Sequence, residues 1–345
     1  HLEALAQHVE PGHAGRARGR GEEAREDAQG RRLARAVGSE ESHDLALLDL
    51  ARAMAPRCDL TIVAMRYPYR RATYAVGGAK VISIGGAHRG PLHTPGIWRD
   101  TALAVKTVRC DVLHAFWAYE PGMIAAWFRS GLPVIISLAG GELVHLPEIQ
   151  YGLMGRLRTR IPILWALRNA QVVTAGSPFL VELAGKLLPS QNLRHLPLGV
   201  DLQRWPFSRR TSQTGIVLNV GSLEPVKGQA VLLRAFQEVL RQVPPARLRI
   251  VGGGQNLSRL KTLSGELGCL EHVEFTGPVP HHDLAGLYAG ASVFAQASWH
   301  EAQGMAVLEA GASGLPIVGT EVGVLPHLAP DSAIRTLVGD DRQLS

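Results

Sequence analysis

Short apolar runs alternate with amphipathic stretches along most of the chain. In the first part they predict strands at 59–65, 80–84, 111–116, 133–138, 171–174 and 193–197. The stretches between them predict helices at 98–108, 120–129 and 151–168, and after Ser177 and Pro178, which suit an N-cap and a first helical position. Strands that alternate with helices indicate βαβ units, hence an α/β fold with a parallel sheet.

The alternation is interrupted once and then restarts. Residues 202–214 combine Arg-Trp-Pro with a polar run of Ser, Arg, Thr and Gln, which predicts an interdomain linker. Further apolar runs predict strands at 216–220, 248–251, 273–276, 292–296 and 316–319, with a helix over 226–243. Because 345 residues suffice for two domains, we expect two Rossmann-like doubly wound domains, 44–201 and 215–345.

Residues 1–43 lack this pattern. They are rich in Ala, Arg, Gly and Glu, and they mix charges of both signs with little apolar periodicity. We expect this leader to be disordered or loosely helical, and the first helix to span residues 44–54.

The chain is moderately basic, with a formal net charge of +6 and an isoelectric point near 9.5. Nucleic acid is excluded as a partner because no basic and aromatic recognition module is present. A phosphorylated substrate or an anionic membrane surface fits the charge as well. The basic, apolar helix around 156–165 has two interpretations, a half-buried core helix or a peripheral contact with anionic lipid.

Cysteine usage and missing motifs limit the chemistry further. Cys58, Cys110 and Cys269 are isolated, which predicts buried free thiols in a reducing compartment, and we expect a cytoplasmic protein, with the inner membrane face as an alternative. The sequence has no D-x-D, H-E-x-x-H or C-x-x-C, so no metal site is expected. It also has no G-x-S-x-G nucleophile elbow.

The stretch His300–Glu309 holds the strongest chemical signal. It joins a predicted strand to a predicted helix that opens at Gly304 and Met305, where free backbone N–H groups favour a phosphate. Glu301 and Glu309 lie on either side, and carboxylates accept hydrogen bonds from sugar hydroxyls. One phosphate seat between two hydroxyl acceptors describes a site for a nucleotide-diphosphate sugar.

Two further turns of the second half carry candidate donor-binding residues. Gly221 and Ser222 follow a strand and lead to Lys227, an arrangement that could hold a phosphate or could be a turn with a solvated lysine. Gly277 to Pro280, which includes Val279, forms another turn, and simple turn chemistry is an equally open interpretation.

Two loops of the first half should face the same cleft. His114 lies at the end of one predicted strand, and Ala139, Gly140, Gly141 and Glu142 follow another. Ligands bind at the carboxyl ends of strands in doubly wound sheets, so we expect both loops near the ligand. A histidine in this position is as often structural as catalytic.

The residues from Glu301 to Thr320, with Gly323 and Pro326, resemble the E-x7-E region of the retaining glycosyltransferases of family 4 (glycosyl transferases group 1). The resemblance implies the GT-B fold, contact of Glu301 with the donor sugar and of Glu309 with the ribose. It also implies that Lys227 binds the diphosphate and that the 277–280 loop seats the base. The second domain would bind the donor, and the first domain, with its loop 139–142, would lie on the acceptor side. Ser222 and Ala139 depart from the family, which usually has Arg and His there.

The resemblance implies transfer of a hexose from a UDP- or GDP-sugar to a glycan or lipid-linked acceptor, with retention and without a cofactor. Catalytic roles would fall to Glu301 and His114. The alternative is a non-catalytic nucleotide-sugar-binding remnant. A dinucleotide-dependent oxidoreductase fits poorly, because the Val251–Gln255 turn lacks the third glycine of the fingerprint.

The resemblance is weakest at both ends. The family's first strand and glycine-rich loop would fall within residues 1–43, where nothing resembles them, and its closing helices have no counterpart after Asp341. We therefore expect a chain that is incomplete at both termini, with residues 215–330 better ordered than the first domain.

Overall fold

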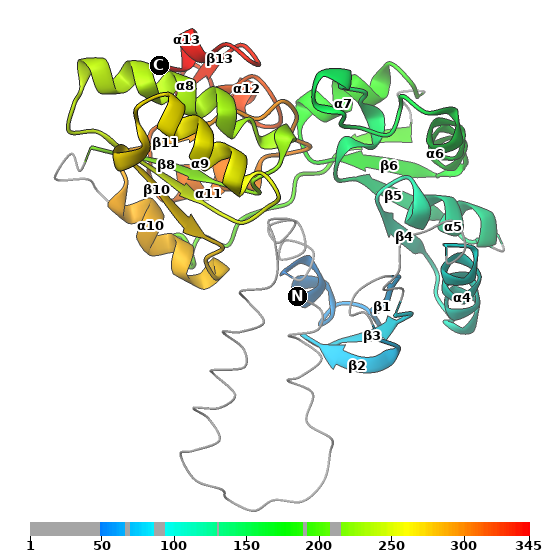
Figure 1. The fold of residues 1–345 in the computed structure, drawn as a ribbon. Helices are drawn as coiled ribbons and strands as arrows, with labels where there is room; N and C mark the ends of the chain where they lie inside the picture. Colours follow the sequence, from blue (N-terminus) through cyan, green and yellow to red (C-terminus); the bar gives the residue numbers. More distant parts are fainter. Residues whose placement is uncertain (1–48, 66–69, 86–93, 130, 189–191, 208–214) are drawn as a thin grey trace, which may run out of the picture.

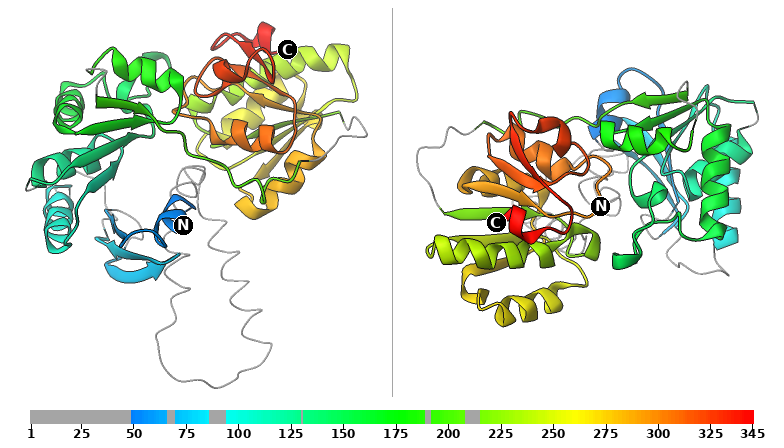
Figure 2. Two further views of the ribbon diagram at one scale, coloured as in Figure 1. Left: turned by 180° about the vertical axis from the view of Figure 1, so that it is seen from behind. Right: turned by 90° about the horizontal axis from the view of Figure 1, so that it is seen from above.

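The computed structural model describes residues 49–65, 70–85, 94–129, 131–188, 192–207 and 215–345. They form two α/β halves side by side, a first half with strands β1–β7 and a second half with strands β8–β13 (Figure 1). The predictions for residues 1–43, and for positions 44–48 of the predicted helix 44–54, lie outside the described residues, whereas residues 49–54 are helical as predicted. Figure 2 shows the same arrangement from behind and from above.

The second half contains a six-stranded, all-parallel sheet of order β10-β9-β8-β11-β12-β13. Its strands are β8 (Ile216–Val220), β9 (Arg247–Val251), β10 (Val273–Gly277), β11 (Val293–Gln296), β12 (Ile317–Thr320) and β13 (Ala333–Thr336). The strand order reverses direction between β8 and β11, so a ligand crevice is expected at the carboxyl ends of these two strands.

Helices cover both faces of this sheet, each with its own apolar core. One core joins α8 (Gln229–Gln242), α9 (Leu257–Glu266) and α13 (Asp341–Leu344) to the sheet. The other joins α10 (Leu284–Gly290), α11 (Met305–Ala312) and α12 (Leu325–Leu328). A sheet buried on both faces explains why its strands read as continuous apolar runs.

The first half is built on two separate sheets within the described residues. A parallel sheet holds β4 (Leu113–Phe116), β5 (Val134–Leu138), β6 (Val172–Ala175) and β7 (Leu193–His195) in that order. Helices α4 (Thr94–Thr107), α5 (Glu120–Phe128), α6 (Leu157–Asn169) and α7 (Pro178–Gly185) connect or precede these strands. A small sheet of order β1-β3-β2 contains β1 (Thr61–Ala64), β2 (Ala72–Val76) and β3 (Ala79–Ser83).

The hairpin between β2 and β3 was not predicted. β2 pairs antiparallel with β3, so this sheet is mixed rather than parallel. Gly77 and Gly78 form the turn with φ values of 56° and 87°. Two successive left-handed residues close a tight hairpin, and glycine adopts that conformation without a steric penalty.

Glycines also move the starts of two predicted helices. Gly152 has a φ of 97°, and a Cβ there would lie 2.1 Å from the Val144 carbonyl oxygen, so the chain is not helical at this residue, and α6 begins later, at Leu157. Gly228 has a φ of 66° and separates a 3₁₀ turn, Pro225–Lys227, from α8. Residues that require left-handed backbone interrupt a helix whatever the apolar pattern around them.

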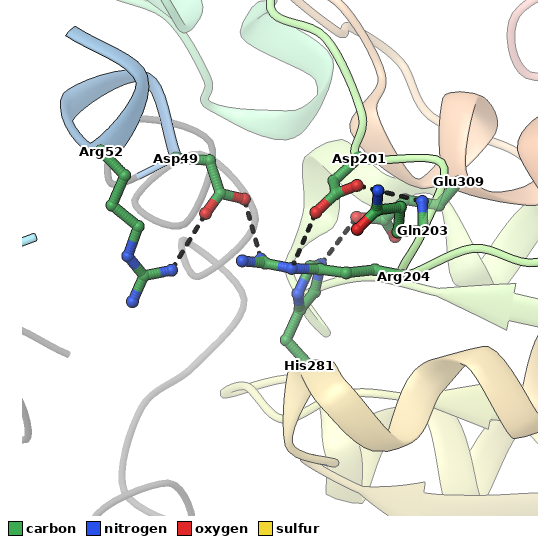
Figure 3. Close-up of polar contacts among 7 residues, drawn as sticks. All are labelled: Asp49, Arg52, Asp201, Gln203, Arg204, His281 and Glu309. Atoms are coloured by element: carbon green, nitrogen blue, oxygen red, sulfur yellow. Dashed lines mark hydrogen bonds and ion pairs between the residues drawn. The ribbon is translucent and has the colours of Figure 1, made fainter. Parts of the chain in front are cut away.

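The described part of the predicted linker, residues 202–207, is packed onto the second half. Trp205 is buried in the core beneath α10, and its ring meets that of Tyr288 edge to face at 5.4 Å. Arg204 forms ion pairs with Asp201 at 3.4 Å and with Asp49 of the first half at 2.9 Å (Figure 3). This segment therefore connects the halves through side-chain contacts as well as through the backbone.

The cysteine prediction is correct in part. All three thiols are free, but only Cys269 is buried, and Cys58 is exposed. Burial raises the pKa of the Cys269 thiol.

Candidate functional site

A cleft lies at the carboxyl ends of β8 and β11, the expected switch point. Most of the predicted donor-binding residues line it, although they come from separate parts of the second half: Gly221, Lys227, Val279, Glu301, Gly304, Met305 and Glu309. The structure thus brings together residues up to 88 positions apart in the sequence.

Lys227 and Glu301 form an ion pair inside this cleft. The Lys227 Nζ donates to Glu301 Oε1 at 2.7 Å, and the Ser298 hydroxyl donates to the same oxygen at 2.8 Å. Gly228 fixes the lysine turn against the loop after β11, because a Cβ at this position would lie 1.9 Å from the Ala297 carbonyl oxygen. The Lys227 side chain keeps 24% of its surface exposed, so a diphosphate could reach its ammonium group.

Both carboxylate oxygens of Glu309 already have partners. Oε1 accepts from His281 Nε2 at 2.9 Å, and Oε2 accepts from the Tyr288 hydroxyl at 2.9 Å (Figure 3 shows the His281 contact). Burial, together with the charge of Glu309, raises the pKa of Tyr288 well above its usual value. These contacts hold the carboxylate in one orientation at the wall of the cleft.

Gly304, Met305 and Ala306 line the cleft between the two glutamates. Gly304 takes a left-handed φ of 91° and lets the chain turn from the loop into α11 at Met305. The Val307 N–H donates to the Gly304 carbonyl at 3.1 Å, whereas the N–H groups of Met305 and Ala306 precede the first intrahelical acceptor, and the helix dipole adds positive potential at this end. Across the cleft, a Cβ at Gly252 would lie 2.0 Å from the Gly221 carbonyl oxygen, so glycine permits this close backbone approach.

Two predicted donor-binding residues lie behind the cleft lining. Ser222 is buried, and its backbone carbonyl accepts from Gln229 Nε2 at 2.6 Å. The Gly277 carbonyl accepts from the Gly252 N–H at 3.0 Å. The structure places both residues as supports for the loops that form the cleft.

The predicted acceptor-side loop meets the loop that carries Glu301. The Gly140 carbonyl accepts from His300 Nε2 at 3.1 Å, so the two halves touch beside the cleft. Glu142 turns back onto its own loop, where its carboxylate accepts from the N–H groups of Ala139 at 3.1 Å and Gly140 at 2.7 Å. A Cβ at Gly141 would lie 2.4 Å from the Tyr151 ring. Burial raises the pKa of Glu142, although these N–H groups oppose the shift.

His114 lies on β4, apart from the residues that line the cleft. Its Nε2 is 2.7 Å from the Ser137 hydroxyl, which is 2.6 Å from the Thr174 hydroxyl, and its ring stacks on Phe116 at 4.5 Å. Desolvation by these neighbours lowers the pKa of His114 to about 4. The imidazole is therefore neutral at pH 7.

We expect His114 to make the protein less stable as the pH falls from about 6.5 to 4. In this window the unfolded chain binds a proton at His114 and the folded chain does not, so protonation favours unfolding. Much of the residue surface remains exposed, and solvent reduces the size of the effect. Urea unfolding of the wild type and of His114→Gln across this range measures it. An identical pH dependence in both proteins would contradict the assignment.

Several residues that line the cleft were not predicted as site residues, and three of them, His281, Asn219 and Gln296, are polar groups that could contact a ligand. His281 follows directly after the 277–280 turn and could have been noticed there. Asn219 and Gln296, on β8 and β11, are buried polar residues within apolar runs, and each leaves one side-chain atom without a hydrogen-bond partner, Asn219 Oδ1 and Gln296 Nε2. A buried polar atom without a partner in a ligand cleft is a candidate ligand contact.

The described residues contain no group of three or more His, Cys, Asp or Glu side chains that could hold a metal ion. The same residues contain no helix that is long and apolar enough to cross a membrane.

Two family models together match almost all of the described chain. "Glycosyltransferase Family 4" matches residues 46–204, and "Glycosyl transferases group 1" matches residues 203–343. The chain belongs to glycosyltransferase family 4. This confirms the family predicted from the E-x7-E region, and the two matches meet at the segment that joins the halves.

Curated relatives of this family 4 protein include a mannosyltransferase and an inositol phosphate glycosyltransferase. The chain is 32% identical over 246 residues to the GDP-mannose-dependent alpha-(1-6)-phosphatidylinositol monomannoside mannosyltransferase of Mycolicibacterium smegmatis, covering 64% of each. It is 37% identical over 153 residues to the D-inositol 3-phosphate glycosyltransferase of Corynebacterium jeikeium, covering 39% of this chain and 36% of the relative. The chain thus spans less than two thirds of these relatives.

Solved glycosyltransferase structures confirm the GT-B fold. Sucrose-phosphate synthase from Thermosynechococcus elongatus superposes with a TM-score of 0.70 at 20% identity, covering 85% of this chain and 79% of that one. Anabaena HepE in complex with UDP and glucose superposes with a TM-score of 0.68 at 19% identity, covering 87% and 83%. At such low identity the likeness concerns the fold alone.

Proposed function

We propose that this family 4 glycosyltransferase moves a hexose from a nucleoside-diphosphate sugar to a lipid-linked acceptor, with retention of configuration. One observation carries the proposal: a cation, a helix N-terminus and two fixed carboxylates share one cleft at the switch point of the sheet. A diphosphate needs the first two, and sugar and ribose hydroxyls need the carboxylates.

Stabilising the negative charge on the leaving diphosphate is the main electrostatic requirement of this reaction. Lys227 and the first-turn N–H groups of α11 would stabilise the negative charge that develops as the bond to the sugar breaks. These groups belong to the protein, so the proposed reaction uses no metal ion. Lys227 would exchange its contact with Glu301 for the diphosphate, and this exchange would free Glu301 for a hydroxyl of the sugar.

Glu309 would bind the ribose. Its carboxylate has lone pairs beyond the two that His281 and Tyr288 use, and its orientation is already fixed. Val279 and Pro278 line the cleft beyond Glu309 and would support the base. The loop of Ala139 and Gly140 would face the acceptor, because it lies against the loop of Glu301.

The relatives support the choice of donor and acceptor. Two mannosyltransferases among them are described as GDP-mannose-dependent and as acting on a phosphatidylinositol mannoside. GDP-mannose and a lipid-linked acceptor are therefore proposed first, with UDP-glucose as the comparison. A lipid-linked acceptor also requires that the protein works at a membrane surface, as a peripheral protein.

Thermal shift and a product assay test this function. GDP or UDP should raise the melting temperature, and NAD should not; stabilisation by NAD alone would favour an oxidoreductase and overturn the proposal. Mass spectrometry of reactions with GDP-mannose or UDP-glucose then detects the glycosylated lipid. Nucleotide binding with neither a glycosylated product nor hydrolysis of the donor would indicate a non-catalytic binder.

Glu309→Gln should weaken nucleotide binding more than it slows turnover at saturating donor. The amide keeps the shape but replaces a charged acceptor by a neutral one, and a hydrogen bond to a charged group contributes about 1.5–3 kcal/mol. We expect the Kd of free GDP or UDP to rise roughly tenfold in isothermal titration. Tyr288→Phe is the control, because it removes a partner of Glu309 and leaves the carboxylate. An unchanged Kd in Glu309→Gln would remove this residue from the ribose site.

A further inference from the structure

Four large apolar side chains gather on the outer surface of α5 and α6. Trp127 is 68% exposed, Leu157 70%, Ile161 63% and Trp165 38%. The two tryptophan rings, from different helices, are 5.7 Å apart between centroids. These four residues form the α5–α6 patch. Contiguous exposed apolar surface of this kind marks an interaction site more often than scattered single residues do.

Arginines border this patch along α6. Leu157, Ile161 and Trp165 are spaced by four residues, so they form one stripe along the helix. At 100° per residue, Arg158 and Arg160 fall on opposite sides of the stripe, and both are exposed. Arg168 continues the stripe one turn beyond Trp165. The helix carries no acidic residue in its first turn or elsewhere.

On the neighbouring helices, a basic residue lies close to α5 and the acidic residue of α5 lies away from the patch. Lys106 at the end of α4 lies over the Phe128 ring of α5, 5.1 Å from its centroid. The acidic residue of α5, Glu120, is at the other end of that helix from Trp127 and accepts from Trp98 Nε1 at 3.1 Å. The patch is therefore apolar at its centre and cationic around it.

We propose that the α5–α6 patch docks this protein on an anionic lipid surface. Tryptophan favours the boundary between headgroups and acyl chains, and arginine can bury its stem while its guanidinium reaches lipid phosphates. A second copy of the chain fits less well, because a two-fold contact through this patch would bring arginines of like charge together. The inference deepens the peripheral contact proposed above, although its test does not require transfer activity.

The position of the patch agrees with this role. In both side views, α5 and α6 lie on the side of the first half that is turned away from the second half (Figures 1 and 2). Docking through this side leaves the nucleotide cleft of the second half uncovered. Donor binding and lipid binding can therefore be measured independently.

Vesicle co-sedimentation tests the docking surface. The wild-type protein should bind vesicles of equimolar phosphatidylcholine and phosphatidylglycerol, bind phosphatidylcholine alone at least about tenfold more weakly, and dissociate at high salt. Arg158→Glu with Arg160→Glu should lower binding to the mixed vesicles at least about tenfold. The matched control is Arg234→Glu with Arg259→Glu, two exposed arginines on helices of the second half.

A second pair of variants tests the apolar part. Ile161→Ser should weaken vesicle binding severalfold, whereas Ile334→Ser, of similar exposure on β13, should not. Circular dichroism and the Kd for GDP or UDP show that each variant is folded. Equal binding to both vesicle types, or patch variants that bind like their controls, would overturn the proposal. So would self-association in the ultracentrifuge that Ile161→Ser abolishes, since this would assign the patch to a second copy.

Discussion

Glu301→Gln is expected to lower turnover roughly a hundredfold while the affinity for free nucleoside diphosphate stays the same or rises. The proposed role of Glu301 is a charged hydrogen bond to the donor sugar, and losing such a bond costs about 1.5–3 kcal/mol. Free GDP or UDP carries no donor sugar, so the loss of this hydrogen bond should not weaken its binding. Glutamine also removes the carboxylate that holds Lys227 at 2.7 Å, so the lysine becomes more available to the diphosphate.

Steady-state kinetics with GDP-mannose and titration with GDP separate these two effects. Ser298→Ala is the matched control, because it removes the hydroxyl that donates to Glu301 and keeps the carboxylate. A rise in the Kd for GDP equal to the loss in turnover would show that Glu301 supports the nucleotide rather than the sugar.

Lys227→Ala should raise the Kd for GDP or UDP about ten- to a hundredfold at low salt. The ammonium group is proposed to contact the diphosphate directly, and charged hydrogen bonds of this kind contribute about 1.5–3 kcal/mol. The side chain is partly exposed, so salt should screen the interaction and reduce the effect. Titration at two salt concentrations measures both quantities.

Lys227→Ala also leaves Glu301 nearly buried without its cation, so folding has to be checked by thermal unfolding. Lys227→Arg restores the charge and should recover part of the affinity. Lys261→Ala, an exposed lysine on α9, is the control for general charge effects. The same Kd in Lys227→Ala and Lys261→Ala would mean that Lys227 is not a diphosphate ligand.

The part of the site that could be predicted is the part that is local in sequence. Glu301, Gly304 and Glu309 belong to one strand–loop–helix unit, β11 to α11, whose order follows from the apolar pattern. Lys227 follows β8, and the carboxyl ends of parallel strands share one edge of a sheet. The family resemblance then supplied the roles, and the family matches confirmed the resemblance itself.

Contacts that depend on strand order could not be predicted. The pairing of Lys227 with Glu301 joins residues 74 positions apart and exists because β8 and β11 are neighbours, which no local pattern states. The contact of His281 with Glu309 likewise requires the turn after β10 to lie over α11. Trp205 was assigned to a linker because Pro and polar residues surround it, yet its ring is buried against Tyr288.

Glycine conformation accounts for the remaining differences. The starts of α6 and α8 depend on Gly152 and Gly228, whose left-handed backbone ends one segment before the next begins. The β2–β3 hairpin depends on Gly77 and Gly78 in the same way. Apolar periodicity predicts which face of an element is buried, but it does not predict the backbone conformation of a single residue.

The loop that carries Glu301 is anchored to the first half on both sides of that residue. His300 donates to the Gly140 carbonyl, the Ser177 hydroxyl donates to the Ala302 carbonyl at 2.5 Å, and Gln303 exchanges two hydrogen bonds with the Leu198 backbone. The halves are therefore not interchangeable modules. A chimaera that joins this second half to the first half of a relative would keep its nucleotide cleft. It would hold Glu301 in place only if the new first half supplied two acceptors, as the Gly140 and Leu198 carbonyls do now, and two donors, as the Ser177 hydroxyl and the Leu198 N–H do now.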